Sequence, residues 1–250
     1  MSSYRFYRRL EPEERMTAFT VKVKETDLWV AVDTQNYTSE LPGMLEEYIW
    51  QKRQELEHFI QENPLFRDTL QPFILDNPAD LHCVPRPALE MIWAGNQAGV
   101  GPMAAVAGLF AELAGKFLLE KTHEVMVENG GDIFLKVEEP CYVGIYAGDS
   151  PLNGQVALEI SPQETPQGIC TSSGKIGPSY SEGQADAVVV TSQSAPLADA
   201  AATALGNMVT AESHLESTLD AAFQIEGVRG VLIIYNDKMA ARGNLKLTHP

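Results

Sequence analysis

Residues 168–209 read GICTSSGKIGPSYSEGQADAVVVTSQSAPLADAAATALGNMV, and this stretch predicts the centre of the fold. The apolar run over 187–191 is typical of a buried strand, and a helix is expected over 197–209. Ser194 can cap that helix, and Pro196 fits its first turn, where a backbone N–H has no intrahelical partner. A strand that leads into an apolar helix indicates an α+β core, in which helices pack against a sheet.

The helix expected over 197–209 carries one narrow polar seam. Asp199, Thr203 and Asn207 recur at every fourth position, so their side chains share one face. A carboxylate and a hydroxyl one turn apart can hold a hard cation such as Mg²⁺, which prefers oxygen ligands. The alternative is that Asp199 favours the dipole of its own helix, while Thr203 bonds back to a backbone carbonyl. The residues alone leave both interpretations open.

Three short motifs follow one another along the chain: VMVENGGDI at 125–133, TSSG at 171–174 and ADAAATAL at 198–205. They resemble, in the same order, the Gly-Gly-Asp/Glu strand end, the Thr-Ser-Gly loop and the Asp-Ala-Leu-Ala-Thr-Ala-Leu signature of the ApbE-like flavin transferases. The resemblance implies an ApbE-like fold, with an antiparallel or mixed sheet packed by long helices. It also implies that Asp199 and Thr203 hold Mg²⁺.

The segment AGVGPMAAVAG at 98–108, together with TSSG, is similar to a narrower branch of that superfamily. This branch is cytoplasmic and largely uncharacterised, and it occurs in archaea and anaerobic bacteria. The resemblance implies a flavin or related nucleotide such as FAD as ligand, and a role in anaerobic sulfur assimilation toward homocysteine.

Glycines in two of these segments have two interpretations each. Gly99 and Gly101 precede an expected helix N-terminus, which favours an anion, but they equally suit tight packing. Gly130 and Gly131 suit a hairpin turn, or a ligand lying against the backbone. The resemblance favours the ligand at the hairpin. The residues expected to bind the flavin nucleotide are Gly99, Gly101, Gly130, Gly131, Asp132, Thr171, Ser172, Ser173 and Gly174.

Two departures from the transferase pattern bear on activity. The Lys-Gly pair of the flavin transferases is replaced by Pro102-Met103-Ala104, and no lysine follows before Lys116. Their His-Ile-hydrophobic-Asp-Pro-x-Thr-Gly segment has no counterpart, because no histidine lies between His123 and His214. These departures predict that the chain does not transfer FMN to protein threonine. The alternative function is a non-catalytic binding or partner protein that keeps the fold.

No catalytic residue is assigned from the sequence. Glu128, Asp132 and Asp186 are acidic candidates without a defined role, and Cys170 suits a small buried residue at a strand end better than a reactive thiol. The three cysteines form no CxxC pair, which favours a reducing compartment over disulfides or zinc.

The charge balance excludes some partners. A formal net charge of −16 predicts that the chain repels nucleic acid and anionic membrane surfaces. The first residues lack the apolar core of a signal peptide, so a cytoplasmic location is expected. The apolar stretch over 98–119 contains Glu112 and Lys116 and does not suit a membrane span. A homodimer is expected only because ApbE-like folds often pair.

The remaining segments predict one domain over 1–250, with its core over 95–250. A hairpin is expected over 16–34 with its turn at 25–27, and an amphipathic outer helix over 39–62. Prolines make 63–88 a connector, and 175–186 is typical of an active-site loop. Further helices are expected over 89–94, over 102–119 after a loop at 96–101, and onward from 209 to 222. Further strands are expected over 125–127, 133–137, 141–146, 155–160, 168–171, 230–235 and 239–247.

Overall fold

A computed structural model describes residues 15–75, 78–174 and 183–249 of the chain. Its main feature is an eight-stranded sheet in the order β1-β2-β3-β4-β7-β8-β9-β10, in which all neighbouring strands are antiparallel. Its strands are β1 (Met16–Val23), β2 (Thr26–Asp33), β3 (Val125–Asn129), β4 (Asp132–Lys136), β7 (Gln167–Ser172), β8 (Ala187–Ser192), β9 (Val228–Tyr235) and β10 (Lys238–Gly243). A three-stranded sheet contains β5 (Cys141–Gly144), β6 (Ala157–Ile160) and β11 (Leu247–Thr248).

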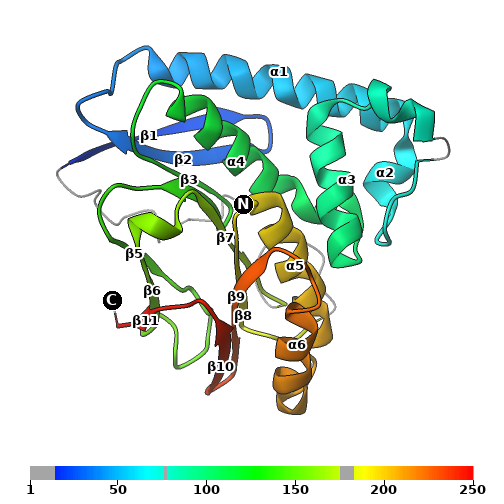
Figure 1. The fold of residues 1–250 in the computed structure, drawn as a ribbon, viewed down its shortest axis with the longest axis vertical. Helices are drawn as coiled ribbons and strands as arrows, with labels where there is room; N and C mark the ends of the chain where they lie inside the picture. The colour runs from blue at the N-terminus through cyan, green and yellow to red at the C-terminus, as the bar shows by residue number, and fades with distance from the viewer. Residues whose placement is uncertain (1–14, 76–77, 175–182, 250) are drawn as a thin grey trace.

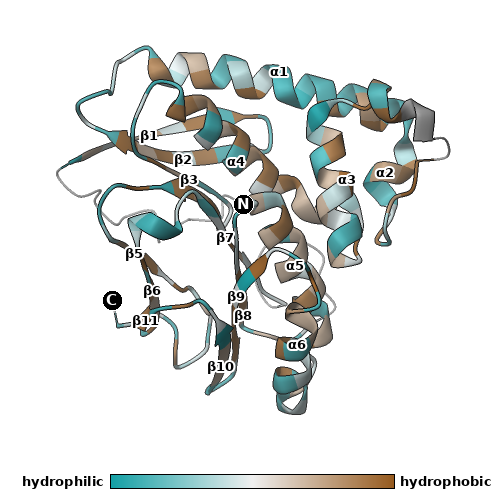
Figure 2. Ribbon diagram, in the orientation of Figure 1, coloured by the Kyte–Doolittle hydropathy of each residue, from teal (hydrophilic) through white to brown (hydrophobic). Residues whose placement is uncertain are grey.

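Helices cover one face of the large sheet. Helices α4 and α5 cross this face, and α1 lies on the outer side of α4 (Figure 1). Figure 2 shows α1 alternating between hydrophilic and hydrophobic residues, whereas α4 and α5 are largely hydrophobic. The helices are α1 (Leu41–Glu62), α2 (Pro64–Asp68), α3 (Arg86–Ala98), α4 (Val106–Leu119), α5 (Ala195–Met208) and α6 (Leu215–Ala222), with 3₁₀ turns at Pro78–Cys83, Pro102–Ala105, Pro162–Glu164 and Glu212–His214.

The small sheet covers the opposite face, so the central strands are buried on both sides. In β8, Val188 and Val190 belong to the core beneath the helices, while Ala187 and Val189 belong to the core beneath the small sheet. Successive side chains of a strand point to opposite faces, so burial on both faces requires a continuous apolar run. This arrangement explains the sequence of β8 and confirms the expected α+β class.

The expected hairpin over 16–34 is confirmed, but its turn was placed too late. Thr26 already pairs with Val23, so Lys24 and Glu25 alone connect the strands. Lys24 has a φ of 53°, and positive φ values match a two-residue turn to the twist of a hairpin. The turn predicted at 25–27 was therefore wrong.

The helix predicted over 89–94 is longer, and the loop predicted at 96–101 is shorter. Helix α3 has a proline in its first turn and ends where Gly99 adopts a φ of 77°. Asn96 remains helical, and its side chain accepts a hydrogen bond from the Phe73 N–H at 2.8 Å and donates one to the Phe73 carbonyl at 2.9 Å. A polar residue typical of loops thus stabilises the connector from within a helix.

Two other helix boundaries differ from expectation. The segment from Pro102 begins as a 3₁₀ turn, and α4 starts at Val106 after Ala105 leaves helical geometry with a φ of −110° and a ψ of 2°. The helix predicted to continue beyond 209 is interrupted, because Val209 has a ψ of 92°. A separate helix, α6, then begins at Leu215.

The remaining strand predictions are confirmed in position but not in length. The strands predicted over 141–146 and 155–160 are shorter and lie in the small sheet. The final segment does return along β9 as the edge strand β10, and residues 247–248 then join the small sheet. The chain end therefore connects both sheets.

The segment Pro102–Leu119 is long and apolar enough to cross a membrane by length and composition. However, 61% of this window is buried inside the fold, between α1, α5 and the sheet. A core helix of a globular protein satisfies the same test, and the packing of α4 gives it that role.

Candidate functional site

Asp199 lies on α5, but its carboxylate binds the first turn of α4. Its Oδ2 atom accepts a hydrogen bond from the Gly108 N–H at 2.9 Å, and the Ala107 N–H also donates to this carboxylate. The first N–H groups of a helix lack intrahelical partners and carry partial positive charge. The interpretation that Asp199 acts on the dipole of its own helix was therefore wrong, because the helix end that it stabilises belongs to α4.

Glu112 completes the reciprocal contact. It lies on α4, and its Oε2 atom accepts a hydrogen bond from the Ala195 N–H at 2.6 Å, at the start of α5. Its Oε1 atom pairs with Lys116. The two helices therefore run antiparallel at this contact, and each supplies a carboxylate to the N-terminus of the other. The sequence signal for Glu112 was an acid at a buried position of an apolar helix, and sequence reasoning did not use it.

Gly108 allows the two helices to approach this closely. A Cβ atom at Gly108 would lie 2.4 Å from the Ala195 carbonyl oxygen and 2.9 Å from Asp199 Cβ. About two turns further along α4, a Cβ atom at Gly115 would lie 2.1 Å from Phe134 Cδ1. The stripe of small residues along α4 is thus a packing surface for α5 and β4.

Asp132 reaches the same region from the β3–β4 hairpin. Gly130 and Gly131 have φ values of 71° and 108°, so they form the turn that places Asp132 at the first position of β4. Asp132 Oδ1 accepts a hydrogen bond from the Thr171 N–H at 3.3 Å. Glu128 Oε1 accepts one from the Gly131 N–H at 2.7 Å, which gives Glu128 a role in holding the turn.

The carboxylates of Asp132 and Asp199 influence one another. Burial, followed by the charge of Asp132, raises the pKa of Asp199 well above its usual range, although the α4 N–H groups act in the opposite direction. Burial also raises the pKa of Asp132 to about 7, with Glu128 adding to the rise and the neighbouring Cys170 thiol and Thr171 N–H opposing it. The two acids therefore form a largely buried pair with excess negative charge when both are ionised.

Cys170 lies between these acids as a fully buried residue of β7. Its Sγ atom donates to the Ala195 carbonyl at 3.4 Å. Burial raises the pKa of the Cys170 thiol well above its usual value, and the charges of Asp132 and Asp199 raise it further. A thiol that stays protonated is a poor nucleophile, so the structure favours a packing role for Cys170.

The Thr171–Gly174 run passes beneath the second half of α5. A Cβ atom at Gly206 would lie 3.2 Å from Ser172 Oγ, and Gly174 packs against the Gly183 backbone. The expected loop over 175–186 begins here, and its residues 175–182 lie outside the described residues. Gly183 in turn approaches the Gly206 carbonyl so closely that a Cβ atom would lie 1.8 Å away.

The polar seam predicted on α5 is present. Asp199, Thr203 and Asn207 are half-buried, while most other residues of the helix are buried. Among the described residues, the Thr203 hydroxyl makes no hydrogen bond, so the predicted bond to a carbonyl of its own helix does not form. The Thr203 oxygen lies one helical turn from the Asp199 carboxylate and is free to accept a ligand.

Residues 8–227 of the sequence match the family described as AbpE bacteria. The chain belongs to this family. It is 46% identical over 198 residues to a UPF0280 protein of Methanocella arvoryzae, covering 79% of this chain and 78% of that protein. It is 36% identical to a UPF0280 protein of Methanocaldococcus jannaschii, with 89% of each chain covered.

Solved structures share the fold of this AbpE bacteria member. A flavinyl transferase ApbE of Pseudomonas stutzeri, in its apo form, is 14% identical with a TM-score of 0.55, covering 91% of this chain and 94% of the other. The ApbE protein of Thermotoga maritima is also 14% identical with a TM-score of 0.55, covering 92% and 97%. The ApbE-like fold expected from the motifs is therefore confirmed.

Two predicted residues of this family member, Gly99 and Gly101, have structural roles of their own. Gly99 ends α3, and the Gly101 N–H donates to the Leu70 carbonyl at 2.9 Å. A Cβ atom at Gly101 would lie 2.0 Å from the Thr69 carbonyl oxygen. Gly99 is explained by its positive φ at the end of α3 and Gly101 by close packing, and their binding of a nucleotide stays a prediction.

The side chain of Asp186 has a structural role, because it forms a hydrogen bond that holds a turn. Its Oδ2 atom accepts a hydrogen bond from the Asn236 N–H at 2.6 Å, in the turn between β9 and β10. Asn236 has a φ of 53°, so this bond supports a turn that a non-glycine residue adopts with difficulty. The structure thus brings together Asp132, Thr171, Cys170 and Asp199, with Thr203 one turn along α5.

Proposed function

We propose that this protein binds a flavin or a related nucleotide, such as FAD, together with Mg²⁺ held by Asp199 and Thr203. The observation that supports the proposal is the pair formed by the half-buried Asp199 and the buried Asp132, in which the charge of Asp132 disfavours ionisation of Asp199. A divalent cation between such acids would remove their repulsion and keep both ionised.

The residues present fit Mg²⁺ better than zinc or another soft metal. The available ligands are carboxylate and hydroxyl oxygens, and among the described residues no group of three or more His, Cys, Asp or Glu side chains could hold a metal ion. Mg²⁺ is commonly bound through one or two carboxylates while it keeps waters or substrate phosphates. An incomplete protein ligand set therefore suits a metal whose other positions belong to a nucleotide.

The surroundings of the acid pair suit a phosphorylated ligand only if a cation is present. The protein has a net charge of −16, and the first turn of α4 already binds Asp199, so it is not free for phosphate. Mg²⁺ would supply the missing positive charge to the phosphates. Backbone at Gly130 and Gly131 borders open space, where a ligand can approach closely.

The proposal covers binding and not FMN transfer to protein. The sequence lacks the histidine segment and the Lys-Gly pair of the flavin transferases, and the Cys170 thiol stays protonated. The same observations favour the second candidate, a non-catalytic binding or partner protein that keeps the fold. A cytoplasmic location and a role in anaerobic sulfur assimilation toward homocysteine remain predictions, and growth of a deletion strain on sulfide would test the latter.

Quenching of FAD fluorescence, with and without Mg²⁺, tests the proposal. We expect Mg²⁺-dependent quenching in the wild type and at least about tenfold weaker binding in Asp199→Ala, because the metal loses its charged ligand. Thr203→Val should weaken the Mg²⁺ dependence while it preserves side-chain volume. Asp237→Ala, which removes an exposed acid from the β9–β10 turn, is the matched control and should bind like the wild type.

Two results would contradict the proposal. Wild-type protein that does not quench FAD in either condition would exclude FAD as the ligand. Binding that neither Mg²⁺ nor Asp199→Ala alters would place the nucleotide elsewhere, and a partner protein would then become the better candidate function.

A further inference from the structure

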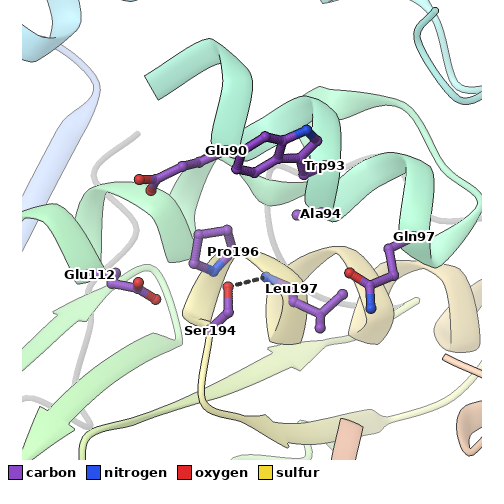
Figure 3. A pocket seen from close by; sticks show the side chains of 8 residues that line it. All are labelled: Glu90, Trp93, Ala94, Gln97, Glu112, Ser194, Pro196 and Leu197. Atoms are coloured by element: carbon purple, nitrogen blue, oxygen red, sulfur yellow. Dashed lines mark hydrogen bonds between the residues drawn. The ribbon is translucent and has the colours of Figure 1, made fainter. Parts of the chain in front are cut away.

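A pocket lies between α3 and the start of α5 (Figure 3). Its volume is about 190 Å³, and none of Asp132, Asp199 and Thr203 lines it. The lining residues are Glu90, Trp93, Ala94, Gln97, Glu112, Ser194, Pro196 and Leu197. Because the acid pair does not line this pocket, a ligand bound in the pocket would be distinct from the proposed nucleotide.

The pocket combines an aromatic wall with an apolar floor. Trp93 is 57% exposed, although tryptophan is usually largely buried. Ala94, Pro196 and Leu197 supply apolar surface next to the indole ring in Figure 3. A ring or alkyl chain of a small ligand would bury this surface and the exposed face of Trp93 together.

The charged groups of the lining are all acidic. Glu90 comes from α3 and Glu112 from α4, and both carboxylates lie on the same side of Pro196 in Figure 3. Among the described residues that line the pocket, none is basic. Trp93 adds the negative face of its ring, which attracts a cation.

The two acids differ in how firmly their existing partners hold them, because Glu112 also accepts the buried Ala195 N–H at 2.6 Å. Glu90 pairs with Arg86 at 2.7 Å, and Glu112 pairs with Lys116. The side chains of Arg86 and Lys116 are 73% and 50% exposed, and ion pairs with such exposed cations contribute little to stability. A cationic ligand can therefore share the Glu90 carboxylate without breaking a strong interaction, while Glu112 keeps its bond to Ala195 and adds negative charge nearby.

An anionic ligand does not suit the same pocket, although it lies at a helix N-terminus. The Ala195 N–H already donates to Glu112, and the Leu197 N–H donates to Ser194 Oγ at 3.3 Å. The first turn of α5 thus has its N–H groups bonded to side chains of the protein, and the nearby charges are negative.

We infer that this pocket binds a small organic cation, a protonated amine with a single-ring or short alkyl body. The ammonium group pairs with Glu90 on the side of the pocket that faces the charge of Glu112, and the apolar body packs between Trp93 and Pro196. Phenethylamine, which is protonated at neutral pH, has this chemistry, and 2-phenylethanol has nearly the same shape without the charge. Comparing the binding of these two compounds separates recognition of the cation from apolar packing alone.

The test is a titration of isotope-labelled full-length protein with each compound in EDTA, followed by the backbone amide NMR shifts of Ala94 and Leu197. We expect saturable shifts with phenethylamine and at least about fivefold weaker binding of 2-phenylethanol, because the alcohol lacks the charge. EDTA makes the result independent of the Mg²⁺ and nucleotide proposal.

Three variants locate the binding. Trp93→Ala and Glu90→Gln change exposed or rim positions and should each weaken phenethylamine binding about fivefold. Trp50→Ala is the matched control, because Trp50 is 44% exposed beside Glu46 and Glu47 but lies on α1. Absence of saturable shifts, equal binding of the alcohol, or binding unaffected by both Trp93→Ala and Glu90→Gln would each overturn the inference.

Discussion

Asp132 shows how burial couples to pH at the scale of one residue. Its folded-state pKa is about 7, above the value of 3.8 expected for an unfolded chain, so the folded protein holds the proton more tightly. The contribution of Asp132 to the free energy of unfolding is therefore fully present below about pH 4. It is lost as the pH rises toward 7, because the unfolded state releases the proton first. Without metal, both acids therefore keep their protons to a higher pH than ordinary aspartates do.

Replacing Asp132 by asparagine should remove this pH dependence. In EDTA, we expect Asp132→Asn to be more stable than the wild type at pH 8 by on the order of 2 kcal/mol, and to differ less at pH 4. The asparagine oxygen can still accept the Thr171 N–H. Urea unfolding at both pH values measures the difference, with Asp237→Asn as an exposed control. A wild type whose stability does not fall between pH 4 and pH 7 would contradict the burial argument.

The close approach of α4 and α5 at Gly108 leads to a second prediction for a single residue. An added methyl group would meet the Ala195 carbonyl oxygen at 2.4 Å, so Gly108→Ala should destabilise the protein by about 1–3 kcal/mol, despite the better helix propensity of alanine. Gly43→Ala in α1 meets nothing within 4 Å and should instead stabilise by up to about 1 kcal/mol. Urea midpoints of the two variants should move in opposite directions. Equal shifts would show that the α4–α5 approach is not tight.

At the scale of elements, α4 and α5 are joined by an exchange of carboxylates. Asp199 binds the N-terminus of α4, and Glu112 binds that of α5, with Gly108 between them. Neither helix has an acidic residue in its own first turn. Each helix end therefore depends on the other helix for its acidic partner, and the position of Asp199 depends on the packing of both.

Glu112→Ala tests this dependence. We expect a loss of about 2 kcal/mol, because the buried Ala195 N–H would have no acceptor, whereas Glu112→Gln keeps an acceptor oxygen and should lose less. Thermal and urea unfolding compare the two variants. Glu120→Ala, at the C-cap of α4, is the control for removing an acid from this helix. Equal losses in Glu112→Ala and Glu112→Gln would assign the effect to charge and not to the hydrogen bond.

For the whole molecule, one large sheet carries two hydrophobic cores. Leu109 belongs to the core under the helices, and Leu158 belongs to the core under the small sheet. Strands such as β8 contribute to both, so neither core can lose its packing without affecting the other. One domain over 1–250 remains a prediction, and so does a homodimer, which sedimentation would test.

Truncation of each core measures this coupling. Leu109→Ala and Leu158→Ala remove fully buried side chains and should each cost about 2–5 kcal/mol. We expect both to shift a single cooperative transition, seen alike by far-ultraviolet circular dichroism and by tryptophan fluorescence. A variant in which the two signals separate would show that the cores unfold independently.

The sequence by itself determined the features that depend on neighbours along the chain. Ser194 and Pro196 defined the start of α5, the spacing of Asp199 and Thr203 defined its polar seam, and Gly130-Gly131 defined the hairpin before Asp132. Such features follow from local backbone geometry and from periodicity. The order of the three motifs predicted the ApbE-like fold. Boundaries failed where a distant contact decided them, as at Asn96, whose side chain binds the connector.

Only the tertiary structure decided which groups meet. The Asp199 carboxylate binds Gly108, 91 residues away, and Glu112 binds Ala195, 83 residues away. Asp132, Cys170 and Asp199 come from two strands and a helix. Trp93 on α3 and Pro196 on α5 line the same pocket. Their proximity, and with it the raised pKa of the acids, depends on sheet order and helix packing. Local periodicity does not contain this information, because the energy of these contacts appears only when distant segments share one core.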